Sequence, residues 1–271
     1  MNGFQQGFTL WKREGVRFLT VPSFERAGGV RCAFSTRVGG VSPAPYDTLN
    51  FSRKREQNKE NFIENMRRFA SATGFNYMDA VVIRYAHSPL LYRAESKDAG
   101  CGVVREGLPE TCDGLYTDTP GLPILSMHAD CVPLFFYDPV GRAASVCHAG
   151  WKGTSQHMAR NALQALLSLG CSAKDILAAI GPCISVKYYE VGEEVAEIFV
   201  REFGDTVIQR RDGSCYADLA AACALDMLET GVPMQNITLS GLCTYGLPKL
   251  FYSHRRDQGR TGAMTAMMEL I

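Results

Sequence analysis

Short apolar runs separated by turns dominate the middle of the chain. Residues 123–127, 133–137 and 143–147 are apolar, and turns at Asp130 and at residues 138–141 interrupt them. Runs of this length, bounded by turn residues, are typical of buried strands. Four further segments have a similar pattern, and we expect strands there too: residues 30–36, 80–83, 176–180 and 237–241.

Between these runs, apolar residues recur at the spacing of helices. The predicted helices are residues 58–73, 154–169, 191–203 and 218–230. Gly74 and Gly170 follow two of them as stop signals, and Asp218 is the expected N-cap of the last, which ends at Gly231. Residues 96–112 are polar and rich in glycine, which predicts a mobile loop.

Strands and helices alternate along the chain, but the strands cluster near its middle. This order favours mixed sheets over one parallel sheet and predicts an α/β (α+β mixed) fold. Because no linker rich in proline and serine and no repeat interrupts the pattern, we expect one domain over residues 1–271.

Composition narrows the class of protein. The 271 residues carry 28 Lys and Arg against 28 Asp and Glu, so nucleic acid is not an expected partner. No apolar run approaches the roughly 20 residues of a membrane span, and the N-terminal residues do not have a signal-peptide pattern. We therefore expect a cytoplasmic protein, whose ten cysteines are mostly free thiols.

Three residues carry the strongest chemical signal: His87, Cys131 and His148. Each follows or interrupts an apolar, strand-like run. One thiolate and two imidazoles suit a borderline-soft metal such as zinc. Three ligands from separate loops leave a fourth position open for water or substrate, which is the arrangement of a catalytic zinc.

The same residues allow other interpretations. Cys131 and His148 could be a buried thiol and a core histidine, or a nucleophile and its base oriented by a third group. The usual zinc deaminase motif, His-x-Glu with Pro-Cys-x-x-Cys, does not occur in the sequence. His128 is expected to lie beside the ligands or to be uninvolved, and His157 to be solvated on its helix.

Arginines beside turns supply candidate anion contacts. Arg37 precedes Gly39 and Gly40, and Arg255 follows His254. Backbone amides of a glycine-rich turn, together with guanidinium groups, suit a phosphate or a carboxylate. Ordinary surface arginine is the alternative for both residues.

Taken together, these motifs resemble the YfiH-like, or polyphenol oxidase (laccase-domain), family of purine nucleoside enzymes. The most specific motifs are Ala129-Asp130-Cys131-Val132-Pro133 and the segment 148–153, which begins with His148. The other matching segments are residues 34–42, 49–50, 179–184, 189–192, 243–244, 251–256 and 261–262. The match is spread over most of the chain in the family's order.

The resemblance implies a YfiH/CNF1-like sandwich of mixed β-sheets flanked by helices. It implies zinc, with copper as an alternative, held by His87, Cys131 and His148. The implied activities are phosphorolysis of adenosine, inosine or methylthioadenosine, and deamination of adenosine. The implied site residues are Cys131, Asp130 and His148 for catalysis, with Asp130 as a proton shuttle, and Arg37, Asn50 and Arg255 for substrate and phosphate. The expected assembly is a monomer or a homodimer.

Three positions depart from the family pattern. Tyr85 stands where the family has glutamine, Ala263 where it has arginine, and His128 where threonine or serine is common. We expect these differences to alter substrate preference or activity.

Three alternative functions remain at this point. One is a copper-binding polyphenol oxidase, although a multicopper cluster needs many imidazoles and the chain has five histidines. Another is a Cys–His thiol hydrolase that edits peptidoglycan precursors. The last is a sensor that binds metal or nucleoside without turnover.

Overall fold

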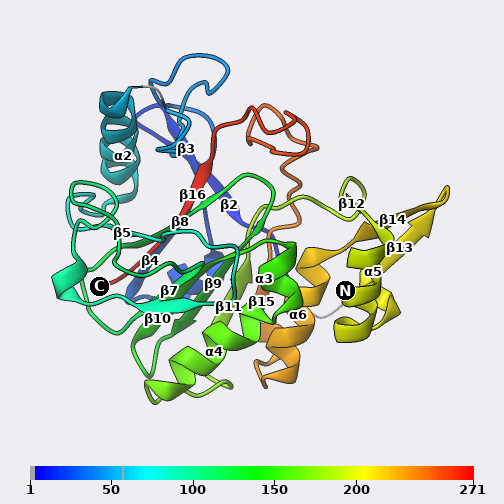
Figure 1. The fold of residues 1–271 in the computed structure, drawn as a ribbon. Coiled ribbons are helices and arrows are strands. Elements are labelled where there is room, and N and C mark those ends of the chain that lie inside the picture. The colour runs from blue at the N-terminus through cyan, green and yellow to red at the C-terminus, as the bar shows by residue number, and fades with distance from the viewer. Residues whose placement is uncertain (1–3, 57) are drawn as a thin grey trace.

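Two β-sheets lie face to face at the centre of the molecule, and helices cover both outer sides (Figure 1). The computed structural model describes residues 4–56 and 58–271. This arrangement confirms the predicted fold class, a mixed α/β sandwich with helices outside.

The larger sheet has seven strands and mixed directions. Across the sheet they run β1 (Gln5–Gln6), β15 (Ile237–Leu239), β11 (Leu177–Ile180), β9 (Val132–Asp138), β10 (Ala143–Ala149), β7 (Gly114–Thr117) and β6 (Leu91–Arg93). The central pairs are antiparallel, whereas β1 and β11 run parallel to β15, and β6 runs parallel to β7.

The second large sheet has six strands. Their order is β2 (Thr9–Arg13), β3 (Val16–Thr20), β4 (Val30–Ser35), β16 (Met264–Leu270), β8 (Ile124–His128) and β5 (Val81–Val82). The sequence pattern did not predict β16, which brings the C-terminal end of the chain into the middle of this sheet. Its polar Glu269 breaks the apolar run and pairs with Arg31 of β4 at 2.7 Å.

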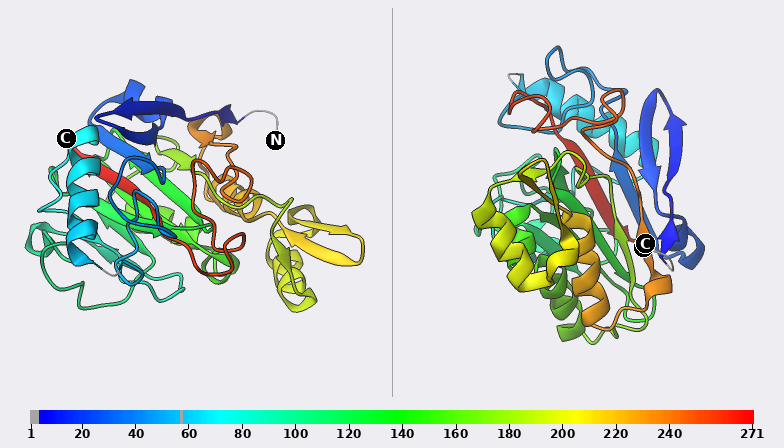
Figure 2. Two further views of the ribbon diagram at one scale, coloured as in Figure 1. Left: turned by 90° about the horizontal axis from the view of Figure 1, so that it is seen from above. Right: turned by 90° about the vertical axis from the view of Figure 1, so that its right-hand side faces the viewer.

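A third, smaller sheet of three antiparallel strands projects from one side together with a helix (Figure 2). Its strands are β12 (Glu190–Val191), β14 (Ser214–Ala217) and β13 (Ile208–Arg211).

The α-helices of the molecule are α1 (Pro22–Ala27), α2 (Lys59–Thr73), α3 (Trp151–Ser155), α4 (Met158–Ser168), α5 (Glu193–Phe203) and α6 (Leu219–Glu229). Short 3₁₀ turns are η1 (Ser96–Asp98), η2 (Asp205–Val207) and η3 (Met234–Asn236). Among the described residues, no helix has both the length and the apolar character needed to cross a bilayer.

Two predicted helix signals are confirmed. The Asp218 side chain accepts a hydrogen bond from the Ala221 amide at 2.9 Å, which caps α6. Gly74 ends α2 in the left-handed conformation, at φ 88°.

The single helix predicted over residues 154–169 is wrong, because the structure has two helices there. His157 adopts φ 59° between α3 and α4, which breaks the helix. Its Nδ1 lies 2.8 Å from Asp226 of α6, and its side chain is only 23% exposed. The prediction that His157 is solvated is therefore wrong as well, since a tertiary contact holds it.

The segment predicted to be a mobile loop, residues 96–112, is packed against the protein. It begins with η1, where Glu95 and Asp98 form a capping box. Val103, Leu108 and Cys112 are buried. Gly100 and Gly102 adopt φ 83° and 84° in tight turns beside buried side chains. Apart from η1 the segment is a loop, as predicted, and its mobility stays a prediction.

Three apolar layers hold the sandwich together. Successive side chains of a strand point to opposite faces of its sheet, so neighbouring residues belong to different layers. In β9, Phe136 packs toward α4 and α6, whereas Phe135 lies between the two large sheets. In β8, Leu125 packs toward α2 on the other outer side, and Ile124 faces the space between the sheets. The strand ends that border this central layer carry the candidate site.

Candidate active site

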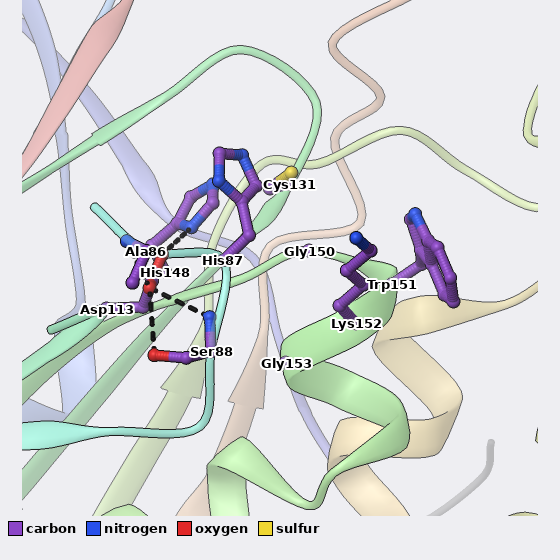
Figure 3. Close-up of a pocket in the computed structure, with 10 residues that line it drawn as sticks. All are labelled: Ala86, His87, Ser88, Asp113, Cys131, His148, Gly150, Trp151, Lys152 and Gly153. Atoms are coloured by element: carbon purple, nitrogen blue, oxygen red, sulfur yellow. Dashed lines mark hydrogen bonds and ion pairs between the residues drawn. The ribbon is translucent and has the colours of Figure 1, made fainter.

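A pocket of about 380 Å³ opens where β8 of one sheet connects to β9 of the other. Figure 3 shows its lining side chains. The lining residues are Ala86, His87, Ser88, Asp113, Cys131, His148, Gly150, Trp151, Lys152 and Gly153. The structure therefore brings the three predicted metal ligands, which lie far apart in sequence, to one pocket.

Cys131 reaches the pocket because the chain crosses between the sheets within three residues. Strand β8 ends at His128 and β9 begins at Val132. Asp130, in the middle of this crossing, adopts φ 99°, a region that non-glycine residues rarely occupy. The sharp turn leaves Cys131 partly exposed.

His148 is fixed on the rigid scaffold, whereas His87 lies on an exposed loop. His148 is the penultimate residue of β10, opposite Pro133 of β9, and is 6% exposed. His87 follows β5 and adopts φ 53°. The two imidazole rings are 5.8 Å apart between centroids and nearly perpendicular.

The metal-binding potential of the trio follows from this geometry. Two imidazoles bound to one zinc ion have ring centroids roughly 5 Å apart, given Zn–N bonds of about 2.0–2.1 Å. The observed 5.8 Å is close to that separation. Over residues 4–56 and 58–271, however, no group of three His, Cys, Asp or Glu side chains forms a metal site as positioned. By its chemistry the donor set, two imidazoles and a thiol, fits zinc or copper.

Asp113 is a site residue that sequence reasoning missed. Its side chain is 1% exposed, and Oδ1 lies 3.1 Å from Nδ1 of His148. Burial raises the pKa of Asp113, but hydrogen bonds from His148 and from the Ser88 and Ala86 amides outweigh this and lower it. In sequence, Asp113 only precedes a short strand, and nothing there indicates that the strand lies beside β10.

His148 is held between Asp113 and Cys131. Burial lowers the pKa of His148, but the charge of the nearby Cys131 and the hydrogen bond that His148 donates to Asp113 raise it to about 9. Cys131, His148 and Asp113 thus form a contiguous thiol–imidazole–carboxylate row.

His128 and Tyr85 lie beside this row. His128 is buried, and its Nδ1 is 3.2 Å from the Cys131 carbonyl oxygen while its Nε2 is 2.8 Å from the Ser126 hydroxyl. Burial, and then the nearby His148, hold its pKa well below the usual value, so the ring is neutral. The Tyr85 ring packs edge-on against His148 at 4.8 Å, and its hydroxyl bonds to the Met127 backbone.

Asp130, the candidate proton shuttle, is fully engaged by other groups. Its Oδ1 accepts a hydrogen bond from the Thr244 hydroxyl at 2.6 Å. Its Oδ2 accepts bonds from the Ser253 hydroxyl at 3.0 Å and from the Arg255 amide at 2.7 Å. These contacts tie the turn that carries Cys131 to the C-terminal loop, so the geometry favours a positioning role over proton transfer.

The predicted anion contacts lie outside the pocket lining. Arg37 donates to the carbonyls of Asp47 and Pro248 and lies over the Tyr252 ring. Arg255 donates to the Glu190 carbonyl, 2.8 Å away. Both guanidinium groups are thus partly used by the protein itself.

Asn50 has no exposed surface with which to contact a ligand. Its side-chain oxygen accepts hydrogen bonds from the Ser52 amide at 2.9 Å and the Ala263 amide at 3.0 Å. The structure therefore gives Asn50 the role of joining two loops, rather than the expected contact with substrate.

The opposite wall of the pocket comes from the turn between β10 and α3. Trp151 and Lys152 line it, and the Lys152 ammonium lies 5.5 Å from the Trp151 ring centroid (Figure 3). A methyl group on Gly150 would lie 3.1 Å from the Cys131 sulfur, so the glycine allows the close approach. The sequence showed this motif, but not that Trp151 and Lys152 line the same pocket as Cys131.

Comparison with known proteins identifies the family. The model of the family described as multi-copper polyphenol oxidoreductase laccase matches residues 31–271. The chain belongs to this family.

Several proteins of similar sequence are named purine nucleoside phosphorylases. The purine nucleoside phosphorylase YlmD of Bacillus subtilis is 34% identical over 246 residues, which are 88% of each chain. A purine nucleoside phosphorylase of Deinococcus radiodurans is 36% identical over 239 residues, again 88% of each chain. The crystal structure of YlmD from Geobacillus stearothermophilus superposes with a TM-score of 0.90 at 30% identity, covering 97% of this chain and 98% of that one.

Proposed function

We propose that this chain is a zinc-dependent purine nucleoside phosphorylase. It cleaves the glycosidic bond of adenosine, inosine or methylthioadenosine with phosphate, and it also deaminates adenosine. One observation carries the proposal: His87, Cys131 and His148 line one pocket in a chain 34% and 36% identical to proteins named purine nucleoside phosphorylases.

His87, Cys131 and His148 would hold the metal. When bound there, zinc supplies Lewis-acid chemistry and lowers the pKa of water near neutrality, which serves attack on the amino-bearing carbon of adenine. The three side chains line the pocket, which gives a substrate room beside them.

The remaining groups bind and orient the substrates. Trp151 offers an apolar face suited to a purine ring, and the Lys152 ammonium offers a charge suited to phosphate. Arg37 and Arg255 remain candidates for phosphate, provided that binding releases them from the carbonyls they now contact. A phosphate dianion below the ribose would meet the positive charge that develops on the sugar as the bond breaks.

One observation favours a second candidate, a thiol hydrolase. Cys131, His148 and Asp113 lie in the order of a nucleophile, its base and the group that orients the base. The substrate of such an enzyme would be an amide, as in the editing of peptidoglycan precursors.

A copper polyphenol oxidase, the activity in the family's description, finds less support. Of the five histidines, His87, His128 and His148 lie near one another, whereas His157 bonds to Asp226 on the helices. Copper at the Cys131 site is chemically reasonable, because copper binds such donors more tightly than zinc.

One experiment separates these functions. The purified protein is analysed for metal, and release of base from adenosine and inosine is followed with and without phosphate. About one zinc per chain, with phosphate-dependent release that a chelator stops, is the expected result. Metal-free protein that is inactive on nucleosides, but loses amidase activity on thiol alkylation, would instead establish the hydrolase.

A further inference from the structure

The buried carboxylate of Asp113 has no part in the phosphorylase proposed above, yet both its oxygens accept hydrogen bonds. Its Oδ1 faces the imidazole of His148, and its Oδ2 faces the loop that carries His87 (Figure 3). Because the side chain is 1% exposed, water does not compete for these bonds.

On the side of Oδ1, Asp113 decides which nitrogen of His148 is free. The Nδ1 atom is 3.1 Å from this oxygen, and an ionised carboxylate only accepts hydrogen bonds. Nδ1 must therefore carry a hydrogen atom, which leaves Nε2 as the nitrogen with a lone pair in the neutral ring. The backbone adds a second tie, because the His148 amide donates to the Asp113 carbonyl at 2.7 Å.

On the side of Oδ2, Asp113 shapes the turn around His87. The same oxygen accepts hydrogen bonds from the Ala86 amide at 2.9 Å and the Ser88 amide at 3.0 Å. These are the two residues that flank His87, whose own backbone is left-handed at φ 53°. The chain thus bends around the carboxylate, and His87 stands at the apex of the bend.

We propose that Asp113 is a positioning residue that sets the tautomer of His148 and the turn of His87 at the same time. One carboxylate thereby aligns two of the three candidate metal ligands, one from a strand and one from a loop. The expected effect on metal binding rests on the metal site of the proposed function. The hydrogen bonds of Asp113 do not depend on that proposal. Carboxylates that orient ligating histidines are typical partners of zinc sites.

Replacement of Asp113 by asparagine tests both the tautomer of His148 and the turn of His87. An amide cannot reproduce the contacts with His148 and with the loop at the same time. If the amide oxygen faces Ala86 and Ser88, its NH₂ faces Nδ1 of His148, and the ring hydrogen must move to Nε2. If the amide is flipped, NH₂ faces the two backbone amides and the turn loses its acceptor. Either orientation disturbs one ligand while side-chain volume is kept.

The molecule contains a matched control. Asp226 is also 1% exposed and pairs with a histidine, since its Oδ1 lies 2.8 Å from Nδ1 of His157. This pair joins helices outside the pocket. Asp226→Asn removes a buried carboxylate from a His–Asp pair without touching the candidate ligands, so it reports the cost of that change for stability alone.

Zinc affinity of the full-length protein is measured by competition with a chelating dye, and Co²⁺ spectra report ligand geometry. We expect Asp113→Asn to weaken zinc about 10- to 100-fold and to change the cobalt spectrum. Asp226→Asn should keep both near the wild type. Wild-type zinc affinity and spectrum in folded Asp113→Asn would overturn the inference.

A second measurement uses the wild type, in case Asp113→Asn does not fold. Nitrogen-15 NMR of labelled histidines identifies which ring nitrogen of His148 carries hydrogen. Hydrogen on Nδ1 and none on Nε2, in the neutral metal-free ring or in the zinc-bound protein, supports the inference. A neutral ring protonated only at Nε2, or zinc coordinated through Nδ1, would refute it. Since the metal-free spectrum recorded above pH 9, where the ring is neutral, already answers this question, failure of the wild type to bind zinc would count against the proposed function alone.

Discussion

At the residue scale, the candidate site depends on few atoms, and Cys131 has the central place. Its sulfur is within reach of His148, and its carbonyl contacts the buried His128. Because the thiol is partly exposed at the end of a turn, it contributes little to the core. Its removal should therefore affect binding far more than stability.

We expect Cys131→Ala to abolish tight zinc binding and nucleoside turnover while the protein stays folded, because one of three ligands is lost. Elemental analysis, activity and thermal unfolding check this. The control is Cys243→Ala, which removes a second partly exposed thiol, one that accepts hydrogen bonds from Ser185 and Gly246. Normal metal content and turnover in Cys131→Ala would rule out the metal mechanism.

The pKa of His148 predicts how the stability of metal-free protein varies with pH. This pKa is raised to about 9, because its interactions with Cys131 and Asp113 outweigh burial. A raised pKa stabilises the fold fully below the unfolded-state value of about 6.5, and that contribution is lost as pH rises through about 9.

Urea unfolding of the metal-free protein at several pH values measures this loss. In Cys131→Ala one cause of the raised pKa is absent, so stability should fall less between neutral pH and pH 9. Identical pH profiles for the two proteins would show that His148 and Cys131 do not interact as the structure indicates.

At the element scale, helix starts and strand ends place the site. Helix α3 begins directly after β10, so Trp151 and Lys152 enter the pocket beside His148. Apolar periodicity located β10 and the region of α4. It did not reveal the break at His157, because that residue is held by Asp226 of α6, a contact 69 residues away in sequence.

Gly150 joins β10 to α3, and its lack of a side chain makes room for Cys131. We expect Gly150→Ala to weaken zinc binding severalfold, since the new methyl group would lie 3.1 Å from the sulfur and push it aside. Zinc affinity by dye competition measures the effect. Gly170→Ala is a poor control because Gly170 adopts φ 91°, whereas Gly107→Ala has open space around it and should bind zinc normally.

The cap of α6 gives a prediction for stability alone. We expect Asp218→Ala to lower the free energy of unfolding by about 1 kcal/mol, because the Ala221 amide loses its acceptor. Burial raises the pKa of Asp218, so the neutral Asp218→Asn, which keeps an acceptor oxygen, should cost less. Urea denaturation compares the variants, and equal losses would contradict the capping role.

At the scale of the whole molecule, the packing of the sheets and helices determines which cysteine thiols are accessible to reagents. Eight of the ten cysteines are buried, and only Cys131 and Cys243 are partly exposed. Burial raises the pKa of Cys112 to about 11 and that of Cys147 to about 12, so these thiols are also unreactive. Sequence spacing alone does not distinguish the two partly exposed cysteines from the eight buried ones.

We therefore expect iodoacetamide to label Cys131 and Cys243 in the native protein and all ten cysteines after unfolding. Added zinc should protect Cys131 and leave Cys243 reactive, because only Cys131 lines the pocket. Mass spectrometry of peptides reads out each site. Equal labelling of Cys131 with and without zinc would argue against its role as a ligand.

The sequence by itself determined the class of fold and the residues worth testing. Apolar runs located β8, β9 and β10, and helical spacing with end signals located α2 and α6, because these patterns arise from local geometry and burial. Cys131, His87 and His148 stood out because thiols and imidazoles at strand ends are chemically conspicuous.

Only the tertiary structure decided how these residues work together. Asp113, Trp151 and Lys152 join the site through the pairing of β7 with β10 and the entry into α3, which no local pattern encodes. Burial removed Asn50 from the pocket, and three hydrogen bonds engaged Asp130. The hydrogen bonds involved join residues 125 positions apart for Asp130 and Arg255 and 213 positions apart for Asn50 and Ala263, so only the folded chain brings them together.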